Sequence, residues 1–503
     1  MASEWLKIFL DNVKNNNRLL EKWLLLQTKH LIHLYFFCGS GSREPNARLT
    51  IPMTGFCFHL IFWEGFWKFR TEQEPKTMQD FPKNLQFYKF AAYGFLKNLK
   101  FFDIFFLLFL REIGISFFEI GVLYAIRQIA INVWEVPSGL LADGFGRKKA
   151  LVFSFANYIL SFILFYFSVS FAMLVFAMIL FAMGEAFRSG THKAMILEYL
   201  KINKLTSIKS KYYGATRSWS QLGSALSSLL SIPIVFYTGS YRFLFLSAMI
   251  PYLADFFLIL SYPKELDRSH GEPISEPHFS VSSLGKSFRD TLRTFLSLFR
   301  DKEVVRTFFN SAGYIAYFKT TKDYLQPLVK QSAVALPFFL YLSAQKRSAV
   351  LIGLVYFVLF LLTSRASRNA WRIEKGLRDT GRALNILFLA GVVSVGVAGL
   401  FLASGLPVAA VIIFLVLYLV QNVRRPVMLG YLSEKIDSRV MASGLSAESQ
   451  IETILVSVYA PLLGWMVDRL GLGYGLILSS LIFVIIYPFI RLPKNQNEGA
   501  NLS

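Results

Sequence analysis

Twelve apolar stretches of about twenty residues follow one another along this chain of 503 residues, and they constrain its fold more than any other feature. A helix must be about this long to cross the hydrocarbon core of a bilayer. Only 17% of the residues are charged, and 50 are Phe. The composition excludes a single soluble globule and a disordered chain. The expected limits of the spans are 88–110, 118–141, 150–169, 172–194, 213–237, 241–261, 303–327, 348–364, 384–403, 407–426, 446–466 and 474–491.

The uneven distribution of Lys and Arg between the loops sets the expected orientation, because these residues gather in cytoplasmic loops. The loop after span 8 carries six basic residues between Arg365 and Arg382, whereas the loops after spans 3 and 9 carry none. We therefore expect the even-numbered loops and both termini to lie in the cytoplasm, and the protein to be a multi-pass protein of the cell (plasma or inner) membrane. The basic excess is explained by these loops and by anionic lipid headgroups, without a nucleic-acid partner.

The chain divides into five predicted segments. Residues 1–77 hold both Cys and four of the eight Trp, and we expect this atypical extension to be poorly structured. An N-terminal six-helix bundle over 78–262 and a C-terminal six-helix bundle over 303–492 flank a cytoplasmic loop at 263–302, in which 284–299 has the spacing of an amphipathic surface helix. A cytoplasmic tail covers 493–503. A short similarity between 192–200 and 424–432 favours duplication of the two halves, which is typical of transporters.

The loop between spans 2 and 3 carries a motif of glycine, acidic and basic residues. Its members are Gly139, Asp143, Gly146, Arg147, Lys148 and Lys149. Gly139 would let a neighbouring helix approach closely, and Gly146 would permit a tight turn. Asp143, where span 2 ends, is placed to accept hydrogen bonds from the N-terminus of a neighbouring helix. The alternative is an ordinary inner loop that follows the charge bias.

This motif resembles the signature loop of the major facilitator superfamily (MFS), although Gly144 stands where that family usually has a base. The resemblance extends over about 86–492. It implies an all-α integral membrane protein with twelve transmembrane helices in two six-helix bundles. It also implies that Asp143 helps to hold the two halves in the outward-open state, and that spans 1, 4, 7 and 10 line a central cavity.

Ionisable residues inside membrane spans are costly and mark functional sites. Most of those in this chain fall on spans 1, 4, 7 and 10. The cavity candidates, including two Tyr that would suit an amphipathic ligand, are Lys97, Lys100, Asp103, Glu185, Arg188, Tyr314, Tyr317, Lys319 and Asp323. The alternative is that these groups form fixed salt bridges between helices.

Two carboxylates on span 11, Glu448 and Glu452, are the candidates for ion coupling, because they stand one turn apart with no base between them. Repulsion between two buried carboxylates favours the binding of a proton by one of them. The competing interpretation pairs one of the two with a base on a neighbouring helix, and Asp255 on span 6 remains a third candidate.

The sequence thus predicts a secondary active transporter that moves a small solute by alternating access, with drug or metabolite efflux as one form. It contains no phosphate-binding loop, no nucleophile motif and no spacing typical of a metal or cofactor site, so we expect neither an enzyme nor a cofactor. The expected partners are a small-molecule substrate, a coupling proton or other ion, and the lipid bilayer, with the protein as a monomer. A membrane sensor or scaffold with the same fold, and a passive channel, are the alternatives.

Overall fold

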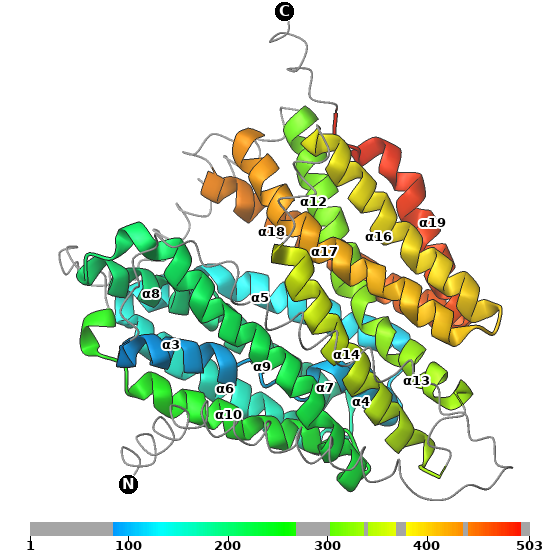
Figure 1. Ribbon diagram of the computed structural model, residues 1–503, viewed down its shortest axis with the longest axis horizontal. Coiled ribbons are helices and arrows are strands. Elements are labelled where there is room, and N and C mark those ends of the chain that lie inside the picture. The colour runs from blue at the N-terminus through cyan, green and yellow to red at the C-terminus, as the bar shows by residue number, and fades with distance from the viewer. Residues whose placement is uncertain (1–83, 268–301, 337–340, 369–378, 436–440, 494–503) are drawn as a thin grey trace, which may run out of the picture. The chain divides into compact units, whose positions relative to one another are not determined.

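The computed structural model describes residues 84–267, 302–336, 341–368, 379–435 and 441–493 (Figure 1). All of them belong to the unit that begins at Phe81. The predicted extension over 1–77, the surface helix over 284–299 and nearly all of the tail over 493–503 lie outside the described residues. In the described part, every regular element is a helix, which confirms the all-helical class.

The first group of helices covers the first six predicted spans. Its α-helices are α3 (Leu85–Leu96), α4 (Phe106–Glu112), α5 (Phe117–Phe145), α6 (Arg147–Phe167), α7 (Phe171–Arg188), α8 (Thr191–Ile202), α9 (Lys209–Thr238) and α10 (Phe243–Leu260). The short 3-10 helix η1 (Asp103–Phe105) precedes α4.

The second group covers the last six spans (Figure 1). Its α-helices are α12 (Lys302–Thr321), α13 (Leu325–Ala335), α14 (Ala344–Arg368), α16 (Thr380–Ala403), α17 (Pro407–Lys435), α18 (Met441–Leu470) and α19 (Leu472–Ile490). The 3-10 helix η4 (Lys322–Tyr324) joins α12 to α13.

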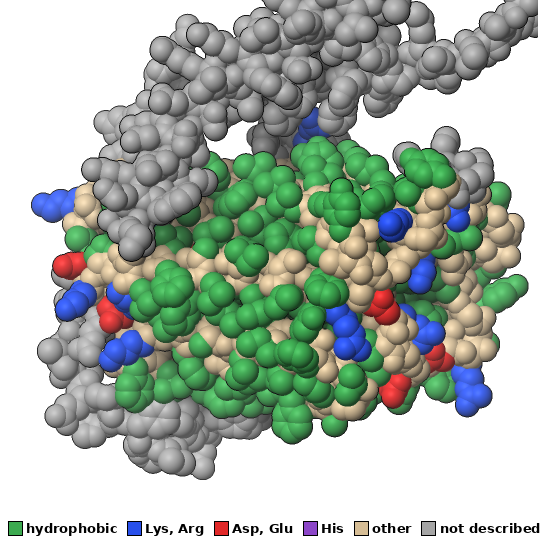
Figure 2. Space-filling view, turned by 90° about the horizontal axis from the view of Figure 1, so that it is seen from below, with side chains coloured by type: hydrophobic (Ala, Val, Ile, Leu, Met, Phe, Trp, Pro, Cys, Tyr) green, Lys and Arg blue, Asp and Glu red, His purple; other side chains and the backbone are tan. Residues whose placement is uncertain are grey.

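Among the described residues, ten helices are long and apolar enough to cross a membrane. Large apolar side chains such as Ile250, Phe257 and Phe489 are exposed on their surfaces. Figure 2 shows one face that is covered mainly by hydrophobic side chains, with most charged side chains toward the two sides of the view. Such a surface is suited to lipid rather than to water.

The remaining two predicted spans, the first and the seventh, are not continuous helices. The chain breaks between α3 and α4, and again at η4 between α12 and α13. The two breaks occupy corresponding positions in the two halves, and both carry charged side chains. A break inside a membrane leaves backbone groups that need new partners. Gln326 of α13 supplies them, because its Oε1 accepts hydrogen bonds from the N–H groups of Leu107 (2.9 Å) and Leu108 (3.4 Å), while its Nε2 donates to Asp103 O (3.1 Å).

The two halves are joined most closely where α5 begins and α18 ends. A side chain at Gly464 would overlap the carbonyl of Phe117, and one at Gly121 would overlap the backbone of Ala460. Small residues here let the two helix backbones touch. A second close approach joins Gly353 of α14 to α9.

Gly139, near the opposite end of α5, is not packed closely against a neighbouring helix of the described part of the chain. We predicted that a neighbouring helix would approach closely at this glycine. Among the residues that the structure describes, none lies within 4 Å of the position that a Cβ atom would take there. That prediction is wrong for this conformation, because the halves meet at the Phe117 end of α5 and leave the Gly139 face exposed.

Candidate functional site: a charged network between the spans

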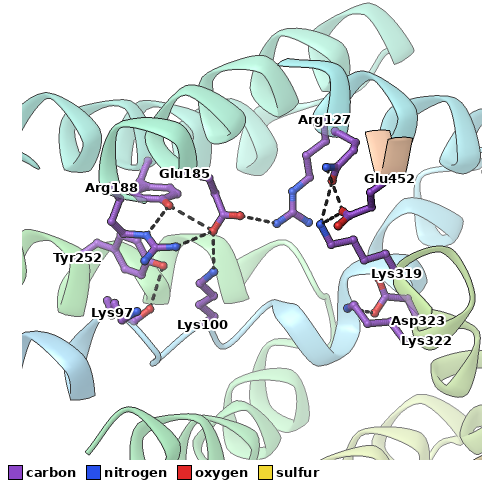
Figure 3. Close-up of polar contacts among 12 residues, drawn as sticks. Lys97, Lys100, Arg127, Glu185, Arg188, Tyr252, Lys319, Lys322, Asp323 and Glu452 are labelled. Carbon is purple, nitrogen blue, oxygen red and sulfur yellow. Dashed lines mark hydrogen bonds and ion pairs between the residues drawn. The ribbon is translucent and has the colours of Figure 1, made fainter. Parts of the chain in front are cut away.

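Glu185 of α7 is the centre of a cluster of cations (Figure 3). Its Oε1 lies 3.3 Å from Lys100 Nζ and 3.3 Å from Arg188 Nη2, and its Oε2 lies 3.0 Å from Arg127 Nη2. The hydroxyl of Tyr158 donates to Glu185 (3.3 Å) and accepts from Arg188 Nε (3.0 Å). Three cations from spans 1, 2 and 4 therefore share one carboxylate.

This cluster is partly exposed although it lies among the spans. The exposed fractions of its four charged side chains are between 17 and 33%. Lys100 and Arg127 both lie over the ring of Phe181, 5.5 and 4.9 Å from its centroid. The ring attracts both cations and supplies an apolar wall beside them.

A second cluster joins the two halves at Gln128, the residue after Arg127. Gln128 Nε2 donates to Glu452 (3.3 Å) and Thr453 (3.4 Å) of α18, and its Oε1 accepts from Lys319 Nζ of α12 (3.3 Å). Lys319 also forms a short ion pair with Glu452. Residues of spans 2, 7 and 11 thus form one polar junction across the interface between the halves.

The break in span 7 holds a third cluster. Lys322 Nζ lies 2.6 Å from Asp323 Oδ1, and Asp323 Oδ2 accepts from the hydroxyl of Tyr124 on α5 (2.9 Å). Lys322 and Asp323 border a cavity of about 270 Å³. Side chains from both halves line it: Asp103, Gln221, Ser224, Phe318, Lys322, Asp323, Tyr356, Leu359, Phe360, Thr363, Ser364, Tyr418 and Asn422.

Lys97 and Asp255 lie deeper in the first half. Asp255 is fully buried, and neither of its carboxylate oxygens has a hydrogen-bond partner among the described residues. It interacts electrostatically with Lys97 and Arg188. The hydroxyl of Tyr252 donates to the backbone carbonyl of Lys97 (3.0 Å), which secures the end of α3.

The structure places Tyr314 and Tyr317 away from the cavity. Both are fully buried within the second half. Tyr314 packs under the guanidinium of Arg424 (4.5 Å), and the Tyr317 hydroxyl donates to Val392 O (3.4 Å). These contacts give the two rings a packing role in this conformation.

The signature loop is bound to its own half of the protein. Gly146 has a φ of 110°, a value that favours glycine, and it separates α5 from α6. Asp267 accepts at Oδ1 from Lys148 N (2.6 Å), and its carbonyl accepts from Arg147 N (2.9 Å). The Arg147 guanidinium lies 3.6 Å from Glu198. Lys149 is exposed beside them.

Asp143 belongs to the helical backbone of α5, while its side chain lies outside the described part of the chain. Its contact with a neighbouring helix therefore stays a prediction.

The two carboxylates of span 11 have different partners. Glu452 pairs with Lys319, and Glu448 accepts a short hydrogen bond from the hydroxyl of Ser311. This geometry corresponds to the alternative in which one carboxylate pairs with a base on a neighbouring helix.

Sequence reasoning left Arg127, Gln128, Tyr158 and Gln326 out of the site. A signal for the first two was present, because an adjacent Arg and Gln interrupt the apolar centre of span 2. Tyr158 and Gln326 carried no comparable signal, since their role depends on contacts with other spans.

Comparison with known proteins identifies the family. The model of the Major Facilitator Superfamily matches residues 96–447, and the chain belongs to that family. The uncharacterized MFS-type transporter YxaM of Bacillus subtilis (strain 168) is 24% identical over 374 residues, which are 72% of this chain and 82% of that protein. The resemblance stated from the signature loop is thereby confirmed.

Solved transporter structures share the fold. The nucleoside transporter NupG superposes with a TM-score of 0.61 at 13% identity, over 81% of this chain and 98% of that one. A D-xylose-proton symporter gives a TM-score of 0.57 at 14% identity, over 82% and 98%. The protein is therefore a multi-pass membrane protein of a transporter family, and that family points to transport rather than to enzyme chemistry.

Proposed function

We propose that this protein is a secondary active transporter, which carries a small solute across the cell membrane by alternating access. The observation that carries the proposal is the junction of Gln128, Lys319 and Glu452 between the two halves, which also line one cavity together. Transporters of duplicated halves bind their substrates at such an interface, where spans are interrupted.

The described conformation supports an inward-facing state. The distribution of basic loops places the Gly139 end of α5 in the cytoplasm and the Phe117 end outside. The halves touch at the Phe117 end, so the outer entrance is closed and the cavity would open toward the cytoplasm. Both termini then lie in the cytoplasm, and the protein acts as a monomer.

Opening to the outside requires several contacts between the halves to separate. Among them are the contact of Phe117 with α18, the hydrogen bonds of Gln326 to the break in span 1, the junction at Gln128, and the hydrogen bond from Tyr124 to Asp323. The proposed contact of Asp143 with a neighbouring helix would form at the inner side. It would offset part of the free energy lost when the outer contacts break.

We propose a proton as the coupling ion, with Glu452 as its acceptor. Glu452 contacts both halves, since it binds Lys319 of α12 and Gln128 of α5. Protonation would weaken both contacts and thereby couple proton binding to separation of the halves. Export of a drug or metabolite and proton-driven uptake both fit such a carrier.

A thermal-shift screen of the purified protein against metabolites and drugs, followed by counterflow in proteoliposomes, tests the proposal. A ligand that binds the folded state raises its apparent stability. A transporter then exchanges that ligand in a saturable manner. A bound ligand that is never exchanged would contradict transport and favour the sensor or scaffold.

A further inference from the structure

Three cations converge on the carboxylate of Glu185. Lys100, Arg127 and Arg188 all contact it. These four groups together carry a formal charge of about +2, since each base contributes one positive charge and Glu185 one negative charge. The buried carboxylate of Asp255, which interacts with Arg188, offsets part of this charge.

Four further ion pairs are formed among the described residues. Arg147 pairs with Glu198, Lys319 with Glu452, Lys322 with Asp323, and Lys435 with Glu303. Glu185 differs from these carboxylates because three bases contact it at ion-pair distance.

The cluster also has unused hydrogen-bond donors. An arginine carries five N–H donors and a lysine three. Arg127 Nε is buried and has no partner among the described residues. Arg127 donates to Glu185 through Nη2 alone, and Lys100 donates to Glu185 in a single contact.

Uncompensated charge among membrane spans is costly, and an anion with several acceptor oxygens would offset that cost. A planar guanidinium is suited to a carboxylate or a phosphate. The apolar wall of Phe181, beside both Lys100 and Arg127, is suited to the organic part of the same molecule.

We propose that Lys100, Arg127 and Arg188 bind the anionic group, a carboxylate or a phosphate, of an organic solute. This inference rests on the proposed transport function and names its substrate class. Glu185 holds the three cations together in this structure, and it would compete with an incoming anion for their donors (Figure 3).

Because Glu185 competes with the anion, two substitutions should change the apparent affinity for the anion in opposite directions. Arg127→Gln removes a cation from the site and should lower the apparent affinity for an anion at least about tenfold, as expected for loss of a charge-assisted hydrogen bond. Glu185→Gln removes the competing charge and should raise that affinity. Lys435→Gln breaks an ion pair at the end of α17, outside the cluster, and serves as the matched control.

The experiment measures thermal shifts of the purified full chain at constant ionic strength. The probes are benzoate, glutarate, phenyl phosphate and inorganic phosphate, with benzamide as the neutral match to benzoate. We expect at least one organic anion to raise the melting temperature in a saturable manner, benzamide to have no effect, and the two variants to move the affinity in opposite directions. A response to inorganic phosphate alone would overturn the organic substrate class.

Failure of all the anions to stabilise the protein would overturn the proposal, as would equal stabilisation by benzamide or an unchanged response in Arg127→Gln. Counterflow of the stabilising anion distinguishes a failure of the proposed anion site from a failure of the proposed transport function. If the anion binds and Arg127→Gln weakens it, but no exchange occurs, transport fails and the anion site stands. If a neutral or cationic solute is exchanged while anions have no effect, the anion site fails and transport stands.

Discussion

Asp468, near the end of α18, accepts hydrogen bonds from two backbone N–H groups at the start of α5, those of Phe117 (3.0 Å) and Phe118 (2.7 Å). A carboxylate is favoured at a helix N-terminus, where N–H groups lack partners within the helix. Ser116 and Glu119 complete the cap within α5 itself. The contact ties the second half of the protein to the first at the end that we assign to the outside.

Asp468→Asn should therefore favour the outward-open state. The loss of charge-assisted hydrogen bonds is expected to shift the ratio of the two states by about tenfold. The measurement uses a chain with Cys38 and Cys57 replaced by Ser, and with Thr453→Cys between α5 and α18. Labelling of Thr453→Cys by an impermeant maleimide added outside the cell should rise in Asp468→Asn.

Asp267→Asn is the matched control for this variant. Asp267 also binds a backbone N–H group, that of Lys148, but both residues belong to the first half. Its substitution should leave the outside labelling unchanged. Equal labelling in Asp468→Asn and the parent chain would show that this contact does not control the outer entrance.

Asp143→Asn should act in the opposite direction. If Asp143 binds the N-terminus of a neighbouring helix in the outward-open state, a neutral amide weakens that state and slows transport. Outside labelling of Thr453→Cys should fall, and the double variant with Asp468→Asn should return toward the parent value. Gly144→Arg, which restores the usual base of the family, should change little. Normal transport by Asp143→Asn would remove the proposed role.

The spans could be predicted from the sequence because each one is defined by its own length and apolar composition. The interruption of span 1 could not, because it depends on Gln326 from another span, which binds the freed N–H groups of Leu107 and Leu108. The charged residues Lys97, Lys100 and Asp103 could be seen in the sequence, but they did not predict that α3 ends at Leu96.

The candidate site could be predicted only in part, because the sequence shows which residues a span contains but not which residues of other spans they contact. Charges inside spans are visible in a sequence, so Glu185, Arg188 and Lys319 could be named in advance. Their partners depend on how the helices pack, which single spans do not encode. Gly139 shows a further limit, since the sequence does not tell at which end of α5 the two halves of the protein touch.

Glu452→Gln and Glu448→Gln should separate the roles of the two carboxylates on α18. Glu452 links Lys319 to Gln128 across the halves, whereas Glu448 binds Ser311 of α12 within one half. We expect Glu452→Gln to abolish uphill transport while counterflow continues, because exchange needs no net movement of protons. Glu448→Gln should retain uphill transport. Uphill transport by both variants at the parent rate would exclude the pair from coupling.

Gly464→Ala should disturb the closed outer entrance, because a Cβ atom at this position would overlap the backbone carbonyl of Phe117. Backbone atoms of two packed helices cannot move apart without separating the halves, so the added methyl group should favour the outward-open state. Gly139→Ala is the matched control, since no described residue lies within 4 Å of its Cβ position in this conformation. The expected result is slower counterflow and greater outside labelling of Thr453→Cys in Gly464→Ala, with the inward-facing state of Gly139→Ala unaffected. Labelling of Gly464→Ala at the parent level would mean that the tight contact between α5 and α18 is not what closes the outer side.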